Sequence, residues 1–249
     1  TKLSIERDLL KASSLLRKGN ILDAENIYRN ILKHFPKNNR ARLALIKIGK
    51  AKPDLELDQN LLDQSINELS ELYRNGDIKN ALNKAQDLGQ KFPTSYKTQN
   101  FLGILAAQSG NLVLSESAFR NAIALRKDSA EGHNNLGNIL NAQGKLKKAI
   151  EHFTSALSIN PLFPQAHNNL ANALMQQSKT SEAEKYYRKA VEINPNYSEA
   201  LNNLGYAVQR LGKVREAEKY YKKAIEINPN YAEAYNNLGT ALVELGELK

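Results

Sequence analysis

Asparagine is the residue type whose positions in this sequence are best suited to recognition chemistry. Two adjacent columns of asparagine recur every 34 residues, and Asn138 and Asn172 add a third position one helical turn later in two copies. The first column holds Asn134, Asn168, Asn202 and Asn236, and the second holds Asn135, Asn169, Asn203 and Asn237. Each side-chain amide offers two donors and one carbonyl acceptor, which match the donor and acceptor of a peptide bond. A row of such amides can therefore hold an extended peptide backbone with little demand on its side chains.

A second interpretation of the same columns stays open at this stage. Asparagines repeated at one spacing also serve the repeat itself, by bonding helix ends or groups within one unit. The sequence alone does not separate peptide capture from this structural role.

The remaining polar residues do not form a catalytic or metal-binding pattern. The four histidines are His34, His133, His152 and His167, and none has the i, i+4 partner of a metal-binding helix. His133 and His167 lie 34 residues apart, so we interpret them as packing residues at one repeated position. The chain has no cysteine, no P-loop, no GxSxG and no dinucleotide-binding glycine motif. We therefore predict no catalytic residue, no metal site and no cofactor.

The elements that position the asparagines are pairs of helices. In residues 130–163, apolar residues recur at three- and four-residue spacing, which predicts a first helix that ends before Gly144. A second helix follows from about 145 to 159 and ends at Asn160-Pro161, since proline cannot continue the hydrogen-bond ladder. We expect the small Gly137 and Ala149 to face each other and let the two helices approach closely.

These columns of Gly, Ala, aromatic, Ala and Pro resemble the tetratricopeptide repeat, a helix–turn–helix unit of 34 residues. The tryptophan usual in that family is absent, and His133, His167, Leu201 and Tyr235 stand in its column. The resemblance implies an all-α fold of tandem helix–turn–helix repeats, stacked into a right-handed superhelical solenoid whose first helices line an inner groove. The asparagine columns resemble those of protein O-GlcNAc transferase and of bacterial proteins that carry such repeats ahead of a sulfotransferase or glycosyltransferase domain.

The same pattern predicts how the chain is divided. Residues 1–50 hold one repeat and an extra helix at about 39–49, and residues 51–61, which include Pro53, read as a linker or a kink. The array then occupies 62–249, with copies at 62–95, 96–129, 130–163, 164–197 and 198–231 and a partial copy at 232–249. That last copy should leave Leu238, Leu242 and Leu245 partly exposed, so we expect the parent protein to continue or the open end to self-associate.

Charge and composition restrict the partners. The formal net charge is +9, and residues 1–61 carry 13 Lys and Arg against 7 Asp and Glu. We interpret this excess as a solvated helix surface and not as a nucleic-acid site, since aromatic and basic residues do not alternate there. There is no long apolar run and no leader pattern, so we expect no membrane contact and a cytoplasmic location.

Together these features predict a protein- or peptide-binding scaffold without catalytic chemistry of its own. The predicted peptide-binding residues are Asn134, Asn135, Asn138, Asn168, Asn169, Asn172, Asn202, Asn203, Asn236 and Asn237. Two alternatives remain: the substrate-recruiting N-terminal region of a larger transferase, and a scaffold that assembles with itself.

Overall fold

The structure, a computed structural model, describes residues 2–36 and 38–247, with side chains for 5–36, 38–48 and 61–247. All regular secondary structure in these residues is helical, which confirms the all-α fold class. The helices are α1 (Lys2–Arg17), α2 (Ile21–His34), α3 (Asn39–Arg74), α4 (Ile78–Lys91), α5 (Tyr96–Gln108), α6 (Leu112–Leu125), α7 (Ala130–Ala142), α8 (Leu146–Ile159), α9 (Pro164–Gln176), α10 (Thr180–Ile193), α11 (Ser198–Arg210), α12 (Val214–Ile227) and α13 (Ala232–Glu244). Among them, no helix combines the length and the apolarity needed to cross a bilayer.

The chain forms two compact units, residues 1–68 and residues 69–249. In the first unit, α1, α2 and the start of α3 pack around one small core. Ala12 and Ala24 are fully buried there, and Tyr28 packs beside them with its hydroxyl 3.2 Å from the Ser13 hydroxyl. This unit is therefore one helix pair followed by a third helix.

The predicted interruption at 51–61 is not a break in the backbone helix, because α3 runs without a gap from Asn39 to Arg74. The extra helix expected to end near 49 thus continues through the predicted linker. Proline disfavours a helix interior, yet the residues around Pro53 are mostly good helix formers, and no glycine lies between Gly49 and Gly76. The side chains of residues 49–60 lie outside the described ones.

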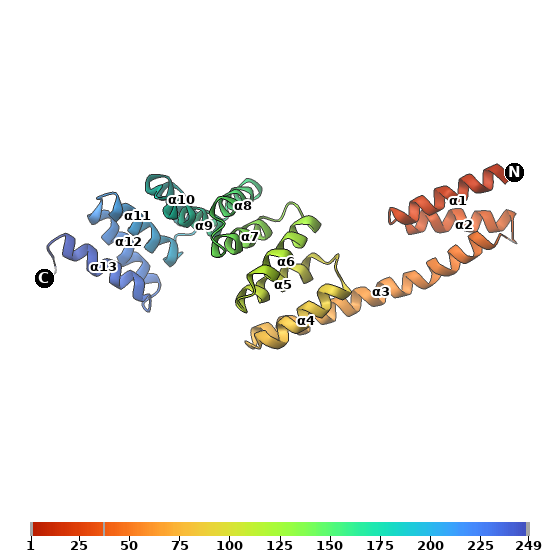
Figure 1. Ribbon diagram of the computed structural model, residues 1–249, viewed down its shortest axis with the longest axis horizontal. Coiled ribbons are helices and arrows are strands. Elements are labelled where there is room, and N and C mark those ends of the chain that lie inside the picture. The colour runs from red at the N-terminus through yellow and green to blue at the C-terminus, as the bar shows by residue number, and fades with distance from the viewer. Residues whose placement is uncertain (1, 37, 248–249) are drawn as a thin grey trace. The chain divides into compact units, whose positions relative to one another are not determined.

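The second unit is a stack of helix pairs. The pairs α5/α6, α7/α8, α9/α10 and α11/α12 follow one another along it, and α13 stands at its end (Figure 1). A short turn joins the two helices of each pair, and one residue of that turn has positive φ, such as Gly144 at 73° and Gly212 at 78°. Ser178 occupies the same place at 61°, where a side chain is disfavoured.

Small residues set the spacing inside each pair. Ala149, Ala183 and Ala217 are fully buried at one repeated position. Gly137 faces the ring of Phe153, since an added Cβ would come 2.5 Å from Phe153 Cε1. The close approach is therefore of an aromatic ring to the backbone of the first helix.

Helix α13 presents to solvent a face that earlier first helices bury. Tyr235 is 49% exposed and Val243 is 58% exposed, while Leu201, one copy before Tyr235, is buried. Leu238, Leu242 and Leu245 are partly exposed, and residues 248 and 249 lie outside the described part of the chain.

Candidate functional site

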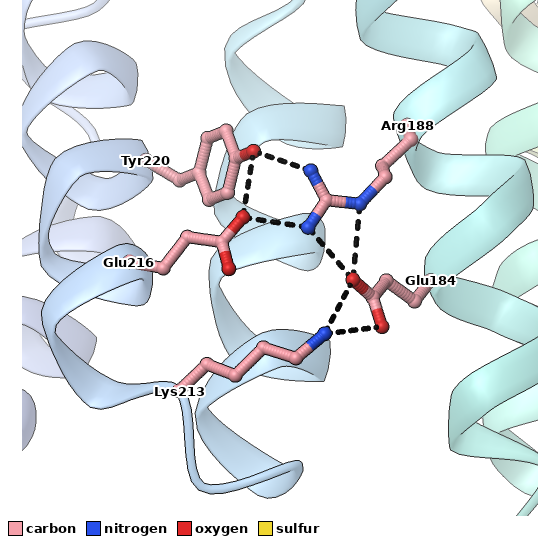
Figure 2. Close-up of polar contacts among 5 residues, drawn as sticks. All are labelled: Glu184, Arg188, Lys213, Glu216 and Tyr220. Atoms are coloured by element: carbon pink, nitrogen blue, oxygen red, sulfur yellow. Dashed lines mark hydrogen bonds and ion pairs between the residues drawn. The ribbon is translucent and has the colours of Figure 1, made fainter.

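Successive first helices approach each other more closely than successive second helices do. Contacts join α5 to α7, α7 to α9, α9 to α11 and α11 to α13, whereas the second helices α6, α8, α10 and α12 make fewer contacts with one another. Long side chains bridge that wider gap, as when Arg188 of α10 reaches Glu216 of α12 at 2.6 Å (Figure 2). The stack therefore bends toward its first helices.

The first asparagine column lies inside the stack. Asn134 is 5%, Asn168 is 0% and Asn202 is 1% exposed, because the next helix pair covers them. Their amides are occupied too: Asn168 donates to Glu199 at 2.9 Å, and Asn202 donates to Glu233 at 3.3 Å. These three residues, predicted to bind peptide, have no surface with which to touch one.

The two columns bond to each other across the helix pairs. The Nδ2 group of Asn169 donates to Oδ1 of Asn134 at 3.0 Å. Asn203 repeats this bond to Asn168 at 3.1 Å, and Asn237 repeats it to Asn202 at 3.0 Å. Each bond ties one copy to the copy before it and contributes about 1 kcal/mol. The asparagines thus have a structural role between neighbouring units.

The second column keeps part of its hydrogen-bonding capacity. Asn135, Asn169, Asn203 and Asn237 are half-buried, and their carbonyl oxygens accept no hydrogen bond from the described residues. Asn138 is exposed, and so is Asn236, which has no following pair among the described residues. Asn172 is half-buried and accepts from Tyr187 and Asn203.

We name the solvent-accessible surface of α7, α9, α11 and α13 the first-helix face. It contains the seven accessible asparagines together with a column of exposed side chains, Glu131, Gln165, Glu199 and Glu233. The carboxylates were not among the predicted peptide-binding residues, although the recurrence of Glu131, Glu199 and Glu233 at multiples of 34 residues was a signal for them.

The first-helix face has a pocket of about 480 Å³ where α9, α11 and α13 meet. Two carboxylates, Glu199 and Glu233, and the amides of Asn172 and Asn203 line it, with Tyr231 from the preceding turn. The polar groups outweigh the apolar ones, so this pocket suits a charged or strongly polar group more than an apolar one.

Tyrosines next to the pocket show that it is electronegative. Burial, together with the Glu233 and Glu199 carboxylates, raises the pKa of Tyr231 to about 12. Burial and the Glu199 carboxylate raise the pKa of Tyr197 to about 12. The carboxylates favour the neutral phenol in both cases. A negative site thus exists on a chain whose net charge is +9.

The described residues were also compared with the requirements of a metal site. No group of three or more His, Cys, Asp or Glu side chains in that part of the chain is arranged to hold a metal ion. His167, predicted to be a packing residue, is buried, and its Nε2 lies 2.9 Å from the Pro161 carbonyl oxygen.

Comparison with protein families identifies repeats of one kind. Models described as "Tetratricopeptide repeat" match residues 9–58, 162–230 and 220–249, and one described as "TPR repeat" matches residues 137–178. No curated protein is similar enough to this chain to count as a relative.

Solved structures show the same fold at low identity. PilF of Pseudomonas aeruginosa superposes with a TM-score of 0.68 at 18% identity, covering 76% of this chain and 86% of its own. MamA gives 0.58 at 23%, covering 66% and 96%, and YrrB, described as a TPR protein with an unusual peptide-binding site, gives 0.55 at 18%, covering 74% and 95%. These similarities concern the fold of the helix pairs.

Proposed function

Since the chain belongs to the tetratricopeptide-repeat family, we propose that it is a protein-binding scaffold whose first-helix face holds an extended, basic peptide segment of a partner. The observation that carries this proposal is the periodic juxtaposition of amides and carboxylates on that face. Asn203 lies between Glu199 and Glu233 around one pocket, so a backbone-binding group and two charge-binding groups meet at one place.

The peptide backbone is assigned to the second asparagine column and to Asn138, Asn172 and Asn236. The second-column carbonyl oxygens accept no hydrogen bond from the described residues, so they are available to the N–H groups of a bound strand. The buried Asn134, Asn168 and Asn202 accept hydrogen bonds from the second column and so fix the orientation of its side chains.

The basic character of the peptide follows from the carboxylates. Glu199 and Glu233 each have one oxygen that accepts from a buried asparagine, and the other oxygen lies toward solvent or the pocket. A lysine or arginine side chain would pair with these oxygens and gain a charge-assisted hydrogen bond.

The spacing of the basic residues follows from the geometry of the repeat. Packed helices lie about 8–10 Å apart, and an extended peptide in the polyproline II conformation advances about 3.1 Å per residue and returns to the same face every three residues. Carboxylates on successive first helices therefore match basic residues about three positions apart. Such a Lys-x-x-Lys segment places one lysine at Glu199 and the other at Glu233.

The test uses fluorescent, end-blocked peptides of one composition, with two lysines either three positions apart or adjacent. Anisotropy at low ionic strength should show that the spaced peptide binds more tightly. Glu199→Gln with Glu233→Gln should weaken it about tenfold, because an NH2 group replaces the carboxylate oxygen that accepts from lysine, while the oxygen that accepts from each asparagine is kept.

The matched control is Glu226→Gln, which neutralises an exposed carboxylate on the second helix α12. It should leave the affinity unchanged. If it weakens binding as much as the Glu199→Gln, Glu233→Gln variant does, the peptide responds to net charge alone and the proposed site is wrong.

The two alternatives need other tests. Whether a catalytic domain accompanies these residues in the parent protein tests the recruiting region of a transferase, and solution mass as a function of concentration tests the self-assembling scaffold.

A further inference from the structure

A second site lies on the opposite side of the stack, where one repeated contact between second helices has changed. In the α10/α12 junction, Arg188 donates to Glu184 at 2.7 Å and to Glu216 at 2.6 Å, and its Nη1 donates to the Tyr220 hydroxyl at 2.8 Å (Figure 2). Lys213 adds a bond to Glu184 at 3.0 Å. Two carboxylates thus balance two cations.

Two copies earlier, the equivalent positions carry a different set of charges. Glu116, Arg120 and Lys145 match Glu184, Arg188 and Lys213, but Lys148 stands in place of Glu216, and His152 in place of Tyr220. A basic residue, Lys148, thus replaces an acidic one, so this junction has an excess of positive charge.

The arginine of this earlier junction is only half engaged. Its Nε and Nη2 groups donate to Glu116 Oε1 at 3.0 and 2.8 Å, and Lys145 holds the other carboxylate oxygen at 2.8 Å. The hydrogen bonds from Lys145 and Arg120 lower the pKa of Glu116 to about 2, so one carboxylate stays charged between two cations. Nη1 of Arg120 has no hydrogen-bond partner within the described residues.

Beside Arg120 is a pocket of about 420 Å³ between α6, α7 and α8. Its lining is mostly apolar and includes Ile123, Ala124 and Leu136. Its polar lining is cationic or titratable, with Arg120, Lys127 and the imidazoles of His133 and His152, and includes no carboxylate. In the α10/α12 junction, the larger ring of Tyr220 packs against the core cluster that contains Leu201, the residue equivalent to His133.

The two histidines form a hydrogen-bonded pair at this pocket. Their Nδ1 atoms are 3.0 Å apart, so in the neutral pair one Nδ1 donates and the other accepts. A further proton is taken up at Nε2 of the donating ring, which leaves this bond in place.

We propose that this pocket binds a carboxylate attached to an apolar body, with the apolar body against Ile123 and Leu136 and the carboxylate at Arg120 and Lys127. The ligand class follows from the lining, which combines an apolar surface with unopposed positive charge. The site shares no residue with the pocket of the first-helix face and does not rest on the function proposed for that face.

Binding at this site should be coupled to a proton on His152. Burial, then the His133 and Arg120 charges, lower its pKa, while Glu151 and Glu116 act in the opposite direction. A bound carboxylate adds a negative charge and raises that pKa again. The complex then takes up a proton, so affinity increases as the pH falls through the pKa of His152 in the complex.

The experiment is an NMR titration of the whole chain with phenylacetate and with phenylacetamide, followed at the Ile123 and Leu136 methyl groups. Phenylacetate should bind about tenfold more tightly, since only it makes charge-assisted bonds. Its affinity should be higher at pH 6 than at pH 8. Equal affinity for the acid and the amide, or no shift at these methyl groups, would overturn the proposal.

Two variants and one control separate binding from folding. His152→Tyr restores the residue of the later copies and should abolish binding, because the phenol fills the pocket while the junction keeps a side chain that the fold already accepts. Arg120→Gln should weaken phenylacetate about tenfold. Arg29→Gln, which removes a similar i, i+4 pair with Glu25 on α2, should have no effect. Unchanged binding by His152→Tyr would refute this location.

A last arm identifies the source of the carboxylate. An end-blocked peptide with Phe-Asp at its centre is compared with the Phe-Asn peptide at the same methyl groups. Binding of the Phe-Asp peptide in addition to phenylacetate assigns the site to an acidic protein segment. Binding of phenylacetate without the peptide assigns it to a free small acid, and both outcomes support the proposed chemistry.

Discussion

The bond between Asn203 and Asn168 can be tested by a double-mutant cycle. Asn203→Ala removes the amide that donates to Asn168 Oδ1 at 3.1 Å. Because Asn168 is 0% exposed, no water replaces that donor, and an unsatisfied buried acceptor costs about 1–3 kcal/mol. Asn168→Ala removes the acceptor itself and also the bond to Glu199, so we expect it to cost about 2–4 kcal/mol.

The double variant should cost less than the sum of the two single variants. Once Asn168 is alanine, Asn203 has no buried partner to leave unsatisfied, so the coupling energy should be about 1 kcal/mol or more. Asn172, which also accepts from Asn203, keeps its bond from Tyr187 in every variant of the cycle.

Native-state hydrogen exchange of the α9 and α11 amides is the suitable measurement. Stacked repeats unfold in parts, so a single global transition would mix the affected junction with unaffected ones. Asn138→Ala, at an exposed position, is the control and should change stability by less than about 0.5 kcal/mol. Additive costs within about 0.3 kcal/mol would show that the two amides are not bonded.

Three further predictions concern packing and charge. Gly205→Ala should destabilise the fold by about 1–3 kcal/mol, because the new Cβ would lie 2.6 Å from a tyrosine ring carbon. Gly239→Ala, whose Cβ would have nothing within 4 Å, should stabilise the fold by up to about 1 kcal/mol. Urea unfolding measures both changes. Ser178→Gly should raise stability by up to about 1 kcal/mol by relieving a φ of 61°, and an unchanged midpoint would contradict this. The hydrogen bond from Lys145, with that from a neighbouring arginine, holds the pKa of Glu116 at about 2. The stabilising contribution of Glu116 is therefore present above pH 4.5 and is lost as the pH falls toward 2. Glu116→Gln should flatten the acid-unfolding profile between these two pH values.

The sequence predicted the fold because the same packing demand recurs in every copy. Ala183 and Ala217 repeat since a helix pair can close only around a small residue there, and both are fully buried. The contacts of Gly137 were predicted only in part, however. The atoms nearest to an added Cβ at Gly137 belong to the ring of Phe153, a contact that depends on the offset between the two helices, which periodicity does not give.

The candidate site was predicted in part for a similar reason. Neighbouring residues on a helix point about 100° apart, so the columns of Asn168 and Asn169 have different surroundings. Which of them is covered depends on where the next helix pair packs, and that requires coordinates. The carboxylates were overlooked because Gln165 interrupts their column and a charged residue on a helix surface is common.

A residue type that is identical in every copy therefore indicates a structural role, and not only the binding role first predicted from it. A column that stays asparagine in four copies does so because each amide bonds the next unit, as Asn169 bonds Asn134. A ligand, in contrast, meets each copy in a different chemical setting, so residues that recognise it are free to differ between copies. The change from Tyr220 to His152 at one repeated position, together with that from Glu216 to Lys148, is a difference of this kind. It alters charge and volume without altering the helix pair, and this makes the α6/α8 junction a stronger indication of a ligand than the regular asparagine columns.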